Sequence, residues 1–241
     1  GINRGFDKGK KVSLNWYLYI KLFLKITFLG TGTSQGIPII GSDHPVCHSD
    51  DPRDKRLRTS ALVQWDDYSI VIDCGPDFRQ QMLHNSIDRL DAILFTHEHA
   101  DHTAGLDDIR PFFFRQGDIP IYALDRVIDN LTQRFGYILN SVDKYPGAPA
   151  VQPHPVDPTT TFQLCQQHII PVVGQHHQLT VLGYRVGSFA YLTDIKTIAD
   201  DERQKLSGHD VLELNALREE PHHSHINLAE TIECATQIGA K

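Results

Sequence analysis

The stretch THEHADH, residues 96–102, decides the fold and chemistry expected of this chain, because it places three histidines and an aspartate within six positions. His97 and His99 lie two residues apart and can share one metal ion, which leaves Asp101 and His102 for a second. Imidazole and carboxylate together suit zinc, manganese or iron. The pattern HxHxDH therefore predicts a site for two divalent ions, provided that it follows a strand.

The surrounding sequence meets that condition. The apolar run DAILFTH (91–97) is typical of a buried strand that ends in the histidine-rich turn. Further candidate ligands also stand at strand ends: either His176 or His177 after IIPVV, and Asp194 at the end of SFAYLTD. A carboxylate offers two oxygens, so Asp194 could bridge both ions. The alternative is a solvated histidine-rich loop, which would not explain why Asp73 and Asp194 also end strands.

Alternating and apolar segments separated by turn residues predict a mixture of strands and helices. The predicted strands are residues 25–30, 61–65, 69–74, 91–97, 119–124, 181–186, 188–194 and 210–215. An amphipathic helix is expected after the fifth strand, to about residue 136, and residues 141–160, rich in Pro, Gly and Asp, are expected to form a long surface loop. Hairpins mixed with helices imply two sheets with helices packed outside.

The last helix has its own start and stop signals. Asn227 and Glu230 predict a capping box at its beginning, and Gly239 could cap its end. Its apolar face is predicted to consist of Leu228, Ile232, Ala235 and Ile238.

Several further motifs narrow the family. They are LGTGTSQGIP (29–38), RTSALVQW (58–65), IDCGPDF (72–78), GLDDIR (105–110) and GYRVGSFAYLTD (183–194). Together with HxHxDH they resemble the metallo-β-lactamase superfamily, in the branch of the carbon–phosphorus lyase accessory phosphodiesterases (PhnP) and, more distantly, the transfer-RNA 3′-processing endonucleases. The resemblance implies an α+β fold, the four-layer αβ/βα sandwich, over residues 25–241. That hydrolase domain is expected to lack its C-terminal strand and the family's last histidine.

The resemblance also implies roles for individual residues. The metal ligands would be His97, His99 and His176 on the first ion, Asp101 and His102 on the second, and Asp194 between them. The catalytic residues would be Asp101 and His225, which begins HINLAE and resembles the general acid of the family. Asp73 would orient a ligand histidine, and Asn215 would orient His225.

A structural zinc site is a further candidate. Relatives carry CxCxxC where this chain has Ser42, His44 and Cys47. His44 and Cys47 could hold zinc with partners from elsewhere, whereas a serine is a poor zinc ligand.

Charge and family together predict the substrate class. Lys and Arg number 23 and Asp and Glu 30, a net charge of −7, whereas proteins that neutralise many nucleic-acid phosphates usually carry a basic surplus. We therefore expect a phosphodiesterase acting on small or cyclic phosphate esters through a hydroxide that bridges two ions (zinc or manganese, or else iron). A transfer-RNA 3′-processing-type endoribonuclease and a metal-binding but non-catalytic chain remain alternatives.

The remaining expectations concern compartment and partners. Four scattered cysteines without CxxC favour a reducing, cytoplasmic environment. No run of eighteen apolar residues predicts a membrane-spanning helix. Residues 1–24 are expected to be a leader outside the fold, because Lys21 interrupts their apolar run and no cleavage site follows. This leader and PFFF (111–114) could form a homodimer interface.

Overall fold

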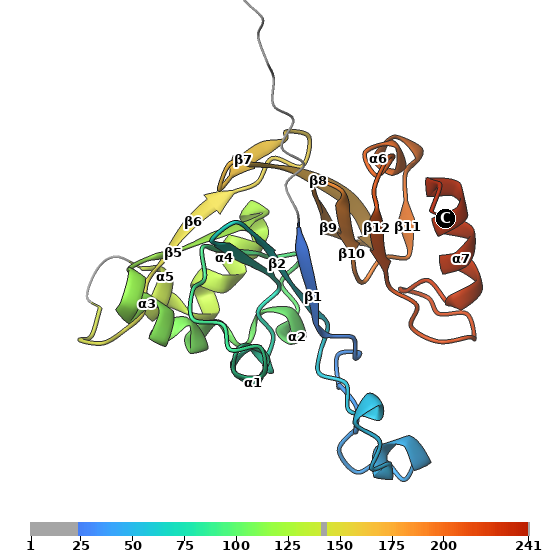
Figure 1. The fold of residues 1–241 in the computed structure, drawn as a ribbon, viewed down its shortest axis with the longest axis horizontal. Coiled ribbons are helices and arrows are strands. Elements are labelled where there is room, and N and C mark those ends of the chain that lie inside the picture. The colour runs from blue at the N-terminus through green and yellow to red at the C-terminus, as the bar shows by residue number, and fades with distance from the viewer. Residues whose placement is uncertain (1–23, 141–143, 241) are drawn as a thin grey trace, which may run out of the picture.

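The computed structural model describes residues 24–140 and 144–240, which form two six-stranded sheets packed face to face with helices outside (Figure 1). In spatial order, the first sheet contains β1 (Lys25–Gly30), β2 (Ser60–Trp65), β3 (Tyr68–Ile72), β4 (Ala92–Leu94), β5 (Ile119–Ala123) and β6 (Val151–Pro155). The second contains β11 (Thr197–Ile198), β8 (Gln167–His176), β9 (Leu179–Val186), β10 (Phe189–Leu192) and β12 (Val211–Leu214), with β7 (Phe162–Leu164) beside β8. The predicted four-layer sandwich is confirmed.

Helices cover the outer face of each sheet (Figure 1). On the first sheet these are α1 (Phe78–His84), α2 (Ala100–Thr103), η3 (Leu106–Ile109), α3 (Arg110–Gln116), α4 (Asp125–Arg134) and α5 (Gly136–Leu139). On the second they are α6 (Asp200–Gln204) and α7 (Leu228–Ile238). Within the described ranges, no helix is both long enough and apolar enough to cross a bilayer. The predicted leader falls outside these ranges, apart from Leu24.

Strand alternation builds the three apolar layers of the sandwich. In β3, Ile70 and Ile72 pack between the sheets, whereas Val71 packs under the helices. Each is fully buried, which stabilises the fold by about 1.5–3 kcal/mol per side chain. Because the central strands of the first sheet are mostly apolar on both faces, the polar groups of a site are expected where these strands end.

Two hydrogen bonds join the sheets beside the THEHADH segment. The Leu182 amide donates to the Thr96 carbonyl at 3.0 Å, and the buried Tyr184 hydroxyl donates to the Phe95 carbonyl at 2.7 Å. The end of β4 is thereby held against β9. This contact sets how ligands from the second sheet meet those of the first.

The predicted surface loop at residues 141–160 is partly wrong, because β6 runs through it. This strand pairs in parallel with β5, and among the described residues no strand pairs with its other side. An edge position tolerates Pro153 and Pro155, which lack an amide proton to donate. The prolines that predicted a loop are therefore compatible with a strand here.

Both predicted caps of α7 are present, but its buried face differs from the prediction. Asn227 and Glu230 exchange the hydrogen bonds of a capping box, and Gly239 has φ +90°. Leu228 and Ile232 are 44% and 60% exposed. The buried side instead runs through Cys234 and Ile238, which pack against the outer face of the second sheet.

Candidate metal centre

The THEHADH loop lies directly against the turn that follows β3. The Cys74 amide donates to the His102 carbonyl at 2.8 Å, and the Gly105 amide donates to the Cys74 carbonyl at 2.9 Å. A Cβ on Gly75 would collide with the Asp101 carbonyl oxygen, and one on Gly105 with the carbonyl oxygen of Gly75. Glycine at these two positions is what allows the two loops to touch.

Asp73 anchors two of the histidines from beneath. Its fully buried carboxylate accepts from the Thr96 amide at 2.8 Å, the Thr96 hydroxyl at 2.9 Å and His102 Nδ1 at 2.7 Å. Because the Thr96 proton points to Asp73, its oxygen accepts from His97 Nδ1, 2.9 Å away. Both rings therefore turn Nε2 toward the same space. Such partners fix a ligand's tautomer and orientation, the role predicted for Asp73.

Asp194 reaches that space from the second sheet. It follows β10 with φ +54°, and Asp73 follows β3 with φ +64°, a left-handed conformation that aspartate tolerates better than most residues. The Asp194 Oδ2 atom lies 3.1 Å from His102 Nε2 and 3.6 Å from His97 Nε2. The turn after each strand thus aims a carboxylate at the same pair of histidines.

Two groups of potential ligands share Asp194. His97, His99 and Asp194 form one, and Asp101, His102 and Asp194 form the other, with ligand atoms within 4.8 Å of one another in each group. His97 Nε2 lies 3.0 Å from His99 Nδ1, and His102 Nε2 lies 3.2 Å from Asp101 Oδ2. Nitrogen and carboxylate donors in two such groups fit two divalent ions of the zinc or manganese type.

The charges of the site point to the same conclusion. Burial lowers the pKa of His97, and the charge of His102 adds to the effect. Burial also opposes protonation of His102, but the carboxylates of Asp73, Asp101 and Asp194 raise its pKa well above the usual value. Conversely, burial opposes ionisation of Asp194, yet the hydrogen bond and charge of His102 hold its pKa well below the usual range. A bound cation would compete with protons for these groups, because metal ligands bind in their deprotonated forms.

His176, rather than His177, lies beside this cluster, although it belongs to neither of the two ligand groups. Its ring centroid lies 5.4 Å from that of His99, and its Nδ1 donates to the Ser224 carbonyl at 3.0 Å, which leaves Nε2 free to bind an ion. His177 is exposed, with φ +56°, and its ring lies 6.1 Å from that of His223. The end of β8 therefore turns only the first of the two histidines toward the other ligands.

His225 borders the cluster, whereas the hydrogen bonds of the Asn215 side chain go to a neighbouring backbone segment and not to His225. His225 Nδ1 lies 3.8 Å from Asp194 Oδ1, and its ring centroid lies 4.5 Å from that of His176. Burial, the largest cause, lowers the His225 pKa. The Asn215 side chain instead accepts from the Ile195 amide at 2.9 Å and donates to the Ile195 carbonyl at 3.2 Å. These hydrogen bonds go to Ile195 and not to His225, so the orientation of His225 by Asn215 stays a prediction.

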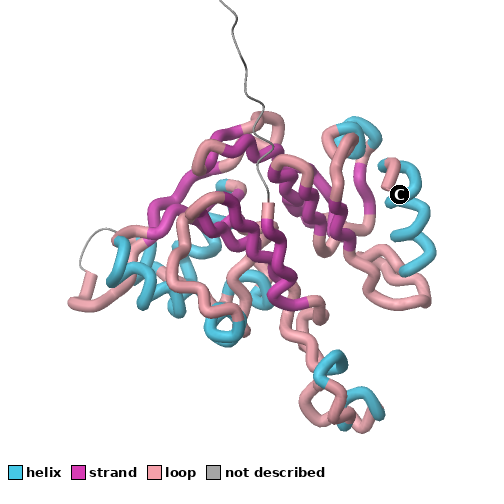
Figure 2. Tube along the Cα trace, viewed as in Figure 1, coloured by secondary structure: helices cyan, strands magenta, loops and turns pink. Residues whose placement is uncertain are grey.

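The candidate structural zinc residues lie in the segment 31–59, which extends away from the sandwich and contains two short 3-10 helices, η1 (Pro45–His48) and η2 (Pro52–Asp54) (Figure 2). His44 is exposed, and its Nδ1 accepts from the Val46 amide at 3.2 Å. Cys47 is buried, and its Sγ accepts from the Ile39 amide at 3.4 Å. Within residues 24–140 and 144–240, neither side chain belongs to a cluster of three or more ligands.

Sequence reasoning missed several residues that hold the site together. Thr96 links His97 to Asp73. Its position directly before the first histidine of the motif is the sequence feature that could have indicated this role. Glu98 pairs with Arg126 at 2.6 Å, and Arg126 also donates to the Thr180 carbonyl. These contacts tie the HxH turn to α4 and β9, and nothing in the local sequence pattern indicates them.

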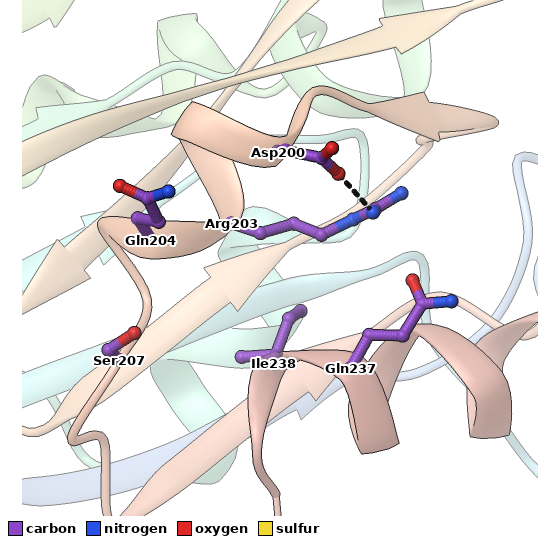
Figure 3. A pocket seen from close by; sticks show the side chains of 6 residues that line it. All are labelled: Asp200, Arg203, Gln204, Ser207, Gln237 and Ile238. Atoms are coloured by element: carbon purple, nitrogen blue, oxygen red, sulfur yellow. Dashed lines mark hydrogen bonds and ion pairs between the residues drawn. The ribbon is translucent and has the colours of Figure 1, made fainter.

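A cavity of about 510 Å³ opens beside the cluster. It is lined by Phe28, Thr31, Gly32, Thr33, Ile37, Arg56, Thr59, Thr193, Asp194, Glu213, Leu214, Asn215, Ala216, Leu217 and His225. A second cavity, of about 350 Å³, lies between α6 and α7, where Arg203 pairs with Asp200 across from Gln237 (Figure 3). Its lining contains none of the candidate ligands, so the first cavity is the one that a molecule bound at the cluster would enter.

Comparisons with known proteins agree with this geometry. The family model described as a beta-lactamase superfamily domain matches residues 68–241. The human short-form tRNase Z (ELAC1) is 18% identical, covering 88% of each chain with a TM-score of 0.63, which shows a shared fold. An octanoyltransferase of Porphyromonas gingivalis is 41% identical over 218 residues. That match covers 90% of this chain but 44% of the relative, so the chain spans less than half of that protein's length.

One solved structure is similar in both sequence and fold. It is described as a new diphosphatase from the PhnP family, and it is 41% identical to this chain with a TM-score of 0.83. The match covers 91% of this chain and 84% of that one. This protein therefore belongs to the PhnP family, within the hydrolases of the beta-lactamase superfamily.

Proposed function

We propose that this protein is a metal-dependent phosphodiesterase that hydrolyses small phosphate diesters or diphosphates. The observation that carries the proposal is that Asp194 belongs to both ligand groups. His97, His99 and His176 would hold one ion, Asp101 and His102 the other, and Asp194 both. Two ions at such a site supply an activated water and neutralise the charge that develops on a phosphoryl group.

His225 would act as the general acid. It borders both Asp194 and the cavity, where the leaving half of a substrate would lie. The adjacent Ile226 amide donates to the Ile195 carbonyl at 3.0 Å, so the His225 backbone is tied to the residue after Asp194. An alkoxide is a poor leaving group, and a positioned acid that protonates it typically contributes about 10²–10⁴-fold to the rate.

Phosphate is the favoured substrate class for two reasons. The similar PhnP-family structure is named a diphosphatase, whereas the octanoyltransferase relative extends well beyond the matched region. The net charge of −7 does not favour the long phosphate backbone of a transfer RNA. Acyl transfer and RNA cleavage therefore enter the test as competing activities.

The test loads the purified protein with zinc or manganese and offers four substrates: bis-p-nitrophenyl phosphate, a nucleoside diphosphate sugar, a precursor transfer RNA and an octanoyl thioester. We expect hydrolysis of the first two. Asp194→Asn should lower that activity by about 10²-fold or more and reduce the bound metal, because both ions lose a ligand.

Asp200→Asn is the matched control, since this carboxylate is 90% exposed on α6. It should leave activity and metal content unchanged. Cleavage of the thioester or the RNA alone, or full activity in Asp194→Asn, would contradict the proposal.

A further inference from the structure

The cavity beside the metal centre is large enough for the leaving half of a substrate. Asp194 and His225 form part of its wall, so a phosphate held at the cluster has direct access to it. Its other walls combine apolar side chains such as Phe28 and Leu217 with threonine hydroxyls. Mixed linings of this kind bind small molecules through apolar contact and a few placed polar groups.

Glu213 is a half-buried acidic residue in this wall, next to Asp194 in the lining of the cavity. It lies in β12 between Leu212 and Leu214, which both pack toward the outer core, so alternation turns Glu213 to the inner face. In the parallel register of β10 and β12 it lies opposite Tyr191. Its Oε2 atom is buried and has no hydrogen-bond partner in the part of the chain that the structure describes.

This arrangement is costly for the folded protein. A buried acceptor without a partner loses its hydration with no compensating bond. Burial raises the pKa of Glu213 to about 8, the charge of Asp194 adds to the rise, and the Leu192 amide opposes it. The nearby Thr59 hydroxyl offers no remedy, because it pairs with the Tyr191 hydroxyl at 3.0 Å.

A buried carboxyl oxygen without a partner is suited to a hydroxyl donor that arrives with the ligand. We propose that Glu213 binds a hydroxyl group on the leaving half of the substrate, so that the enzyme selects phosphate esters or diphosphates of sugars and similar polyols over apolar ones. The phosphate part of this statement rests on the proposed function, whereas the hydroxyl part rests on Glu213 and the cavity alone.

An inward charge on an edge strand also discourages pairing with other strands, and that role would need no ligand. The two roles differ in what a substitution changes. If Glu213 only protects the edge, its removal should cause association of the protein and leave ligand preference intact. If Glu213 binds a hydroxyl, its removal should change the ligand preference and leave the oligomeric state of the protein unchanged.

The experiment uses two phosphate monoesters with the same six-membered ring size: glucose 1-phosphate, which carries ring hydroxyls, and cyclohexyl phosphate, which carries none. Calorimetry on the metal-loaded protein gives both Kd values for the wild type, Glu213→Leu, Glu213→Gln and the exposed control Glu220→Gln. Glu213→Leu should weaken binding of glucose 1-phosphate relative to cyclohexyl phosphate by about 2–10-fold, the effect of one lost hydrogen bond to a neutral carboxyl group.

Glu213→Gln keeps one acceptor and should lie between the wild type and Glu213→Leu, while Glu220→Gln should match the wild type. Melting temperatures of both Glu213 variants should equal or exceed the wild-type value, which shows that they fold. An unchanged ratio of the two Kd values, or no binding of either probe, would overturn the inference. The protein could also lack phosphodiesterase activity and yet show the expected loss of preference for glucose 1-phosphate in Glu213→Leu. That result would leave the inference standing and refute the proposed function instead.

Discussion

The two halves of the candidate metal centre differ in how they are held. On the first sheet, His97, His102 and Asp73 are fully buried and joined in one hydrogen-bonded network. On the second sheet, His176 and His225 are partly exposed, and each comes from a different loop or strand end. A rigid half that fixes ligand geometry thus faces a more open half that borders the cavity. Both halves supply metal ligands, since Asp194 comes from the second sheet. We infer that the buried network of the first half fixes the orientation of its ligands, whereas His225 in the second half governs what is cleaved.

The largest effect on catalysis is expected from removal of His225, which tests the role of the second half. Bis-p-nitrophenyl phosphate and diphenyl phosphate share charge and shape, but the phenolate of the latter is the more basic leaving group. His225→Ala should lower kcat for diphenyl phosphate by about 10²-fold or more, because the leaving oxygen is then not protonated. For the nitrophenyl ester the loss should be far smaller. Steady-state rates and metal content measure this, and equal losses on both esters would contradict the acid role.

Removal of Asp73 should break the first half. Asp73→Ala leaves the Thr96 amide and hydroxyl and His102 Nδ1 without their acceptor, so both ligand rings lose their orientation. We expect metal affinity and activity to fall by about 10–100-fold on both esters. Unfolding in urea should show a loss of about 3 kcal/mol or more, since a buried partner is removed.

Asp67→Ala, in the exposed turn between β2 and β3, is the control and should change neither quantity. If Asp73→Ala instead retained its metal and lost activity on diphenyl phosphate alone, the division between the two halves would be wrong.

The same contrast explains what could be predicted from the sequence. THEHADH is contiguous and follows an apolar strand, so its convergence is a local property of one strand and one turn. The Asn227–Glu230 capping box is local as well, and it is present. By contrast, the prolines of β6 predicted a loop because the pattern cannot reveal that the strand lies at an edge. The inward direction of Glu213 depends on how β12 packs, which only the folded chain shows.

Asn215 illustrates the limit most clearly. Its position suggested a contact with His225, and the folded chain places its amide on the Ile195 backbone instead. Ile195 follows Asp194, and its carbonyl also accepts from the Ile226 amide, next to His225. We therefore propose that Asn215 is a positioning residue that acts on Asp194 and His225 through the backbone of one residue, Ile195. No spacing rule in the sequence indicates such an indirect link.

Asn215→Ala should have the smallest of these effects. Loss of two hydrogen bonds to Ile195 should cost about 1–3 kcal/mol of stability and lower kcat several-fold, because the backbone beside Asp194 is held less firmly. Asn215→Asp keeps the acceptor for the Ile195 amide and should recover part of both losses. The decisive readout is the ratio of rates on diphenyl and bis-p-nitrophenyl phosphate. A ratio equal to that of the wild type indicates that Asn215 acts through Asp194 alone, whereas a ratio that falls as in His225→Ala indicates that it also serves the general acid. An unchanged kcat on both esters would contradict the positioning role.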